Sequence, residues 1–180
     1  MKILFLSITG LFFVFSLSGC IDFYKVSYGI NLQTPDKGTA IVHLYDLRSD
    51  AVKEKDLETD KQNIFQFALK SNDFLQSMKQ EGKNIQKREL YVSGDTLDAN
   101  VIYTFDSITS VENMQHDAGF FYLTLEPSDS VISTNGEIIT SKDRKRILWD
   151  KSMKTLKFEI LSNTFSGKSY KMLGPYYKPE

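Results

Sequence analysis

Apolar and polar side chains alternate along residues 96–106. The apolar members are Leu97, Ala99, Val101, Tyr103 and Phe105, the polar members are Asp98, Asn100, Thr104 and Asp106, and Ile102 is the only apolar exception. Because successive side chains of a β-strand point to opposite faces, this pattern predicts a strand with one buried and one solvated face. A strand of that kind is typical of an antiparallel sheet that is covered on one side.

Other segments have the same β-rich character and surround turn signals. Strands are predicted over residues 23–33, 39–46, 84–93, 120–125, 130–134, 137–140, 146–149 and 155–161. The pair Asn135-Gly136 predicts a two-residue type I′ turn, since that turn needs positive φ at both central positions. The chain should therefore contain several antiparallel hairpins.

The period changes over residues 49–82, where Ile64, Phe67, Ala68, Leu75 and Met78 recur at helical spacing. The sequence Thr59-Asp60-Lys61-Gln62 fits a capping box at the start, and Gly82 is expected to end the segment. Ser71-Asn72-Asp73 either caps a second helix or is a polar turn on one long helix. A further short helix is expected over residues 107–114. The order ββα, ββα and then strands predicts an α+β fold, a mainly antiparallel sheet with one or two helices packed on one face.

Composition excludes several classes of protein. The 180 residues suit one domain, and the formal net charge of −1 is not that of a generally basic nucleic-acid binder. Because Cys20 is the only cysteine, a disulfide framework inside the domain is excluded.

The amino terminus has the pattern of a secretion signal. Met1 and Lys2 precede an apolar run that is too short to span a bilayer and ends in Leu17-Ser18-Gly19-Cys20. An aliphatic residue, two small residues and a cysteine resemble the lipobox of the bacterial lipoprotein family. The resemblance implies that residues 1–19 are a cleaved signal peptide and that Cys20 carries the lipid. Residues 20–22 would then form a minimal tether, and residues 23–180 a single globular domain.

The same resemblance implies a place in the bacterial cell envelope. In enterobacterial lipoproteins an aspartate directly after the cysteine retains the protein at the inner membrane, and this chain has Ile21 there. We therefore expect the outer membrane, facing the periplasm, in a host with two membranes, and the outer face of the cell membrane in a host with one. Since an extended chain spans about 3.3–3.6 Å per residue, the short tether should hold the domain close to the bilayer.

Signals for catalysis are weak. The two histidines, His43 on a predicted strand and His116 in a predicted loop, occur without a Gly-x-Ser-x-Gly elbow or a His-Glu-x-x-His motif. We therefore expect no enzyme, no cofactor and no catalytic, cofactor-binding or metal-binding residues, and we place a hydrolase last among the functions. A basic cluster, Lys142, Arg144, Lys145, Arg146, Lys151, Lys154 and Lys157, either meets anionic headgroups or forms a charged edge that discourages aggregation.

A second resemblance concerns the carboxyl-terminal half. Val131-Ile132-Ser133-Thr134-Asn135-Gly136, then Arg146-Ile147-Leu148-Trp149 and Leu156-Lys157-Phe158, are similar to the closing segment of LppM-type envelope lipoproteins. That family is associated with an α+β envelope domain and with lipid-like ligands, although this chain lacks its carboxyl-terminal membrane helix. The resemblance implies a non-enzymatic binding module for a lipid or other hydrophobic ligand. The alternative is a protein-interaction subunit of an envelope complex that uses an exposed sheet edge or the tyrosine-rich tail.

Overall fold

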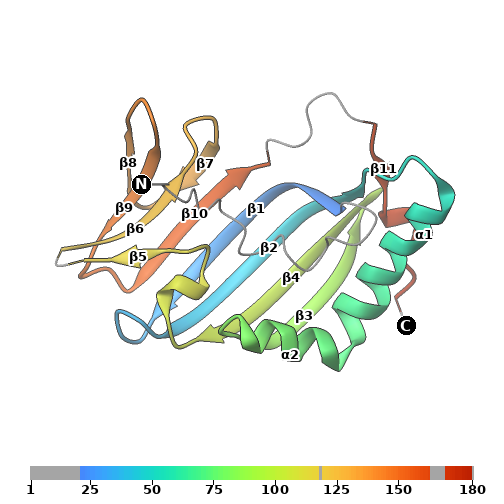
Figure 1. Cartoon of the computed structure of the whole chain (residues 1–180), viewed down its shortest axis with the longest axis horizontal. Helices are drawn as coiled ribbons and strands as arrows, with labels where there is room; N and C mark the ends of the chain where they lie inside the picture. Colours follow the sequence, from blue (N-terminus) through green and yellow to red (C-terminus); the bar gives the residue numbers. More distant parts are fainter. Residues whose placement is uncertain (1–20, 118, 163–168, 180) are drawn as a thin grey trace, which may run out of the picture.

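The computed structural model describes residues 21–117, 119–162 and 169–179, which form two antiparallel sheets and a helical segment (Figure 1). The predicted signal peptide, residues 1–19, and the predicted lipid-attachment site Cys20 lie outside the described residues. The fold is α+β, as the element order predicted.

The larger sheet has seven strands, in the order β3-β4-β2-β1-β10-β7, with β11 paired to β2. Its strands are β1 (Ile21–Leu32), β2 (Gly38–Ser49), β3 (Lys83–Ser93), β4 (Thr96–Phe105), β7 (Ser130–Thr134), β10 (Thr155–Leu161) and β11 (Lys171–Met172). All of its pairings are antiparallel. The predicted hairpins β1–β2 and β3–β4 are confirmed, and they pair with each other through β2 and β4.

The smaller sheet has four strands in the order β5-β6-β9-β8. They are β5 (Gln115–His116), β6 (Phe120–Leu125), β8 (Glu137–Thr140) and β9 (Lys145–Asp150). The main hydrophobic core lies between the two sheets, where Trp149 of β9 packs 5.9 Å from Phe158 of β10 between ring centroids. The small sheet therefore covers one end of one face of the large sheet.

The helical segment covers the other end of that face. It consists of α1 (Glu54–Gln62), a π-helical turn η2 (Asn63–Ala68) and α2 (Asn72–Gln80). Ser71 caps α2, because its hydroxyl accepts a hydrogen bond from the Asp73 amide at 3.0 Å, so the two-helix alternative is the right one. Gly82, with φ +80°, ends the segment as predicted.

The predicted capping box at Thr59 is wrong. The helix begins at Glu54 with Lys53 as its N-cap, and Thr59 lies inside the first helix, where its hydroxyl donates to the Lys55 carbonyl at 3.1 Å. Asp60, in the same motif, is fully buried under the helix. The motif matches a capping box in sequence, but Asp60 serves tertiary packing, which the local sequence does not reveal.

The Asn135-Gly136 turn also differs from its prediction. β7 and β8 do not pair with each other but belong to different sheets, so these two residues carry the chain from one sheet to the other. Neither residue has positive φ. Glycine is required at 136 for another reason: a Cβ there would lie 2.6 Å from the Leu148 carbonyl oxygen and 2.7 Å from Trp149 Nε1.

Three smaller predictions need correction. The expected helix over residues 107–114 is only a 3₁₀ turn, η3 (Ile108–Ser110), and Ile108, Val111 and Met114 are buried. His116 lies on β5 rather than in a loop. Asp98, predicted on the solvated face of β4, is buried, and it accepts a 2.8 Å hydrogen bond from the amide of Asp46, a residue with a positive φ of 56°.

The carboxyl-terminal residues close the end of the large sheet near α1. β11 extends the pairing of β2 at Ser49, and the 3₁₀ turn η5 (Gly174–Tyr176) places Tyr177 against Phe65, 5.4 Å between ring centroids. Among the residues that the structure describes, no helix is long and apolar enough to cross a membrane.

Candidate functional site

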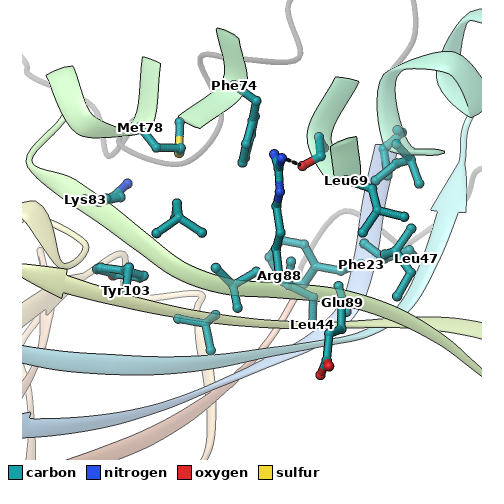
Figure 2. Close-up of a pocket in the computed structure, with 18 of the residues that line it drawn as sticks. Phe23, Leu44, Leu47, Leu69, Phe74, Met78, Lys83, Arg88, Glu89 and Tyr103 are labelled. Carbon is teal, nitrogen blue, oxygen red and sulfur yellow. Dashed lines mark hydrogen bonds between the residues drawn. The ribbon is translucent and has the colours of Figure 1, made fainter. Parts of the chain in front are cut away.

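A cavity of about 150 Å³ lies between the helical segment and the large sheet (Figure 2). Its floor is the half of the sheet that the small sheet leaves uncovered, and its roof is η2 and α2. The alternation recognised in β4 supplies part of the floor, because Ala99, Val101 and Tyr103 all line the cavity. The predicted helical stripe supplies part of the roof through Ile64 and Met78.

The walls of the cavity are mostly hydrocarbon. Phe23 and Leu44 contribute from β1 and β2, and Leu69 and Phe74 from the helical segment. An apolar space of this size does not favour water, because a water molecule needs polar partners to replace its hydrogen bonds. The cavity is therefore suited to hydrocarbon.

Arg88 of β3 is the polar residue that stands inside this apolar space (Figure 2). A shift of register between Ile85 and Lys87 turns Arg88 and Leu90 toward the cavity. The Arg88 guanidinium donates from Nη1 to the Ala68 carbonyl at 2.7 Å and to the Ser71 carbonyl at 3.1 Å. Burial lowers the pKa of Arg88.

Sequence analysis did not single out Arg88. Read from Ile85 with a period of two, the strand would place Arg88 on the outer face. The sequence offers one indication of the true orientation. Leu90 lies two residues after Arg88, so both side chains point to the same face of the strand, and an apolar leucine favours the buried face. A β-bulge reconciles the two halves of the strand, and bulges have no strong sequence signature.

The other charged residues of the cavity wall are paired. Lys83 is buried, and its Nζ lies 3.3 Å from Glu81 Oε2. Glu89 projects away from the cavity in Figure 2, and its carboxylate lies 2.8 Å from Lys87 Nζ.

Two buried tyrosines lie where the cavity meets the main core. The Tyr28 hydroxyl donates to Glu112 Oε1 at 2.7 Å, and Tyr103 lines the floor beside it. Burial raises the pKa of both phenols well above the ordinary tyrosine value, with the Glu112 carboxylate adding to the effect. Both side chains are therefore neutral at physiological pH.

The two histidines lie in different sheets. His43 lies on β2 in the large sheet, while His116 lies on β5 in the small sheet and contacts Asp36 at 3.0 Å through Nε2. Over the described ranges, no group of three or more His, Cys, Asp or Glu side chains gathers where it could hold a metal ion.

The basic cluster is spread along and around β9 and β10. Several of its members have structural partners: Lys151 donates to the Asp117 carbonyl at 2.6 Å, Lys145 to the Asp129 carbonyl, and the Arg146 guanidinium lies 4.9 Å from the centre of the Tyr122 ring. β9 lies between β6 and β8, and β10 lies between β1 and β7, so the cluster does not follow an edge strand of either sheet.

A second buried polar group lies under α1, outside the cavity. Asp60 Oδ2 accepts a 2.5 Å hydrogen bond from the Ser49 hydroxyl, while Asp60 Oδ1 has no hydrogen-bond partner among the residues that the structure describes. Burial raises the pKa of Asp60, since removing the carboxylate from water disfavours its charged form.

Comparison with known proteins yields no relative: no protein-family model, no curated protein and no solved structure matches this chain.

Proposed function

We propose that this chain is a lipid-anchored envelope protein that acts as a non-enzymatic binding module, holding the hydrocarbon part of a ligand between its helical segment and its large sheet. The apolar cavity of about 150 Å³ is the observation that carries this proposal. The anchor would be the lipid on Cys20. The protein would be located at the outer membrane, facing the periplasm, in a host with two membranes, or on the outer face of the cell membrane in a host with one membrane.

The energetics of the cavity support a ligand. The cavity is partly open, and its apolar walls gain free energy when a ligand removes them from water. Hydrocarbon that enters the cavity recovers about 0.8 kcal/mol for each buried methylene group. A cavity of about this volume accommodates a benzene-sized molecule, so it would hold a segment of an acyl chain rather than a whole lipid.

The position of the cavity also supports the proposal. Ile21 and Phe23, which follow the predicted lipidated cysteine almost directly, line the cavity. Ile21 is already paired with Ser49 in the sheet, so only the Cys20 residue itself would link the fold to the lipid. The cavity would then lie within a short distance of the membrane, where hydrophobic ligands are available.

The test uses residues 20–180 with Cys20→Ser, so that no acyl group is attached. We expect native mass spectrometry to show a lipid-sized adduct that is lost on denaturation, and the fluorescent probe N-phenylnaphthylamine to bind and be displaced by dodecanol. Val101→Phe fills the cavity from its floor and should abolish both signals. Ile102→Phe is the matched control, because the next residue of β4 points to the opposite face of the sheet.

The proposal fails if wild type neither carries an adduct nor binds the probe. It also fails if Val101→Phe and Ile102→Phe bind the probe equally well, because the probe would then occupy another surface.

A second candidate is a protein-interaction subunit, which rests on the exposed isoleucines of two edge strands. Ile132 of β7 is 50% exposed, and Ile138 and Ile139 of β8 are 44% and 48% exposed. β7 and β8 are the outermost strands of their sheets, so their backbones are available to a partner strand. Crosslinking in membranes should then give an adduct that Ile139→Lys removes; recovery of the monomer alone would contradict this function.

A further inference from the structure

The guanidinium of Arg88 has hydrogen-bond donors to spare inside the cavity. Arginine has five N–H donors in a planar fork. Within the described part of the chain, the hydrogen bonds of Arg88 are those that Nη1 makes to the Ala68 and Ser71 carbonyls. The edge formed by Nε and Nη2 is therefore left for another acceptor.

That edge is held in a fixed orientation. The two carbonyls come from the junction between η2 and α2, so Nη1 is fixed to the roof of the cavity while the side chain rises from its floor (Figure 2). The ring of Phe74 packs against the guanidinium, 5.6 Å from ring centre to Arg88 Cζ. A guanidinium held in this way loses little further freedom when it binds a ligand.

No carboxylate of the cavity wall neutralises Arg88. Glu89 is the only acidic residue that lines the cavity among the described residues, and it points away from the cavity toward Lys87. Lys83, the other cation of the wall, has Glu81 beside it. The lowered pKa of Arg88 agrees with the absence of a neighbouring carboxylate, because burial is its only cause. A half-buried cation without an anion is unfavourable, and a ligand anion would remove that cost.

We infer that Arg88 binds the anionic headgroup of the ligand, so that the ligand class is a single-chain amphiphile ending in a carboxylate or a phosphate. This inference rests on the proposed function, because the chain of the same molecule would occupy the cavity. The two oxygens of a carboxylate or phosphate match the spacing of Nε–H and Nη2–H, which together make a bidentate, charge-assisted pair.

The test compares three probes that share one chain: dodecanoate, monododecyl phosphate and the neutral dodecanol. Affinities are measured at neutral pH by calorimetry on residues 20–180 with Cys20→Ser. We expect the better anion to bind about ten- to a hundredfold more tightly than dodecanol, the range of a hydrogen bond to a charged group. Tighter binding of dodecanoate would indicate a fatty acid as the source, and tighter binding of the phosphate would indicate a phosphorylated lipid.

Variants assign the preference to Arg88. Arg88→Met should bind the two anions no more tightly than it binds dodecanol, a comparison between probes on one and the same variant. Arg88→Lys keeps the positive charge but lacks the paired Nε–H and Nη2–H donors, so it should retain only part of the preference for anions over dodecanol. Lys87→Met is the matched control: it removes a cation from the neighbouring residue, which pairs with Glu89 away from the cavity, and should leave the preference unchanged.

The outcomes separate the two proposals. If wild type binds dodecanol as tightly as both anions, the inference about Arg88 is overturned while the cavity remains a hydrocarbon site. Binding of none of the three probes refutes the cavity function itself. If Arg88→Met does not fold, Arg88→Lys serves in its place: an anion preference as large in Arg88→Lys as in wild type would overturn the assignment to Arg88.

Discussion

Replacement of Asn135 by glycine distinguishes two accounts of the Asn135-Gly136 turn. A type I′ turn accepts glycine at either central position, so that account predicts little effect. In the structure the Asn135 side chain instead makes three hydrogen bonds, to β9 and to β10. Its Oδ1 accepts hydrogen bonds from Trp149 Nε1 at 2.9 Å and from the Lys157 amide at 2.7 Å, and its Nδ2 donates to the Thr155 carbonyl at 2.9 Å.

The magnitude follows from these three bonds. Each contributes about 0.5–1.5 kcal/mol, and since Asn135 is itself exposed we expect the lower part of their sum, a loss of about 2–3 kcal/mol in the free energy of unfolding. The indole N–H of Trp149 adds to the loss, because this side chain is only 1% exposed and would lose its acceptor. For a chain of this length the corresponding fall in Tm is about 4–12 °C.

The assay is urea unfolding followed by the fluorescence of Trp149, the only tryptophan, and by circular dichroism. Asn84→Gly on the edge strand β3 is the control, because it makes the same substitution without removing the three side-chain hydrogen bonds of Asn135, and it should lower the free energy of unfolding by only about 0.5–1 kcal/mol. If Asn135→Gly is no more destabilising than Asn84→Gly, the connecting role of the side chain is refuted.

Three further predictions concern stability. Ser71→Ala should lower the free energy of unfolding by about 1 kcal/mol through loss of the α2 cap, whereas Thr59→Ala, which removes no cap, should change it by less than about 0.5 kcal/mol; equal losses in urea titrations would refute this. Burial raises the pKa of Asp60 in the folded state above the ordinary 3.8. Its stabilising contribution is therefore complete below that pH and is lost as pH rises through the folded pKa. The free energy of unfolding of wild type minus that of Asp60→Asn should thus fall with rising pH, and a pH-independent difference would contradict the burial. Tyr28→Phe removes a buried hydrogen bond to Glu112 and should cost about 1–3 kcal/mol, which thermal unfolding would show; an unchanged Tm would refute it.

Much of the fold could be predicted because its strands are amphipathic. The boundaries of β6, β7, β8 and β10 follow directly from the β-rich segments, and the alternation in β4 identifies a face that lines both the core and the cavity. Period-two patterns of this kind are local, so they can be read from sequence without knowing the partner strands. The Ser71 cap is equally local.

The predictions that failed depend on contacts between distant residues. Asp98 is buried and accepts a hydrogen bond from the amide of Asp46 on the neighbouring strand, and Asn135-Gly136 is shaped by Trp149 rather than by a hairpin. Arg88 reaches the cavity only through a bulge in β3. None of these three features has a local sequence pattern that separates it from an ordinary strand or turn.

The most direct test of the cavity as a ligand site is the position of a bound chain. Isotope-filtered NOE spectra of residues 20–180 with Cys20→Ser, saturated with dodecanoate, report which protein methyl groups lie against the methylene groups of the ligand. The account predicts NOEs to Val101 and Leu44 on the floor and to Met78 on the roof. NOEs confined to the exposed isoleucines of β7 and β8, with none to these three residues, would contradict it.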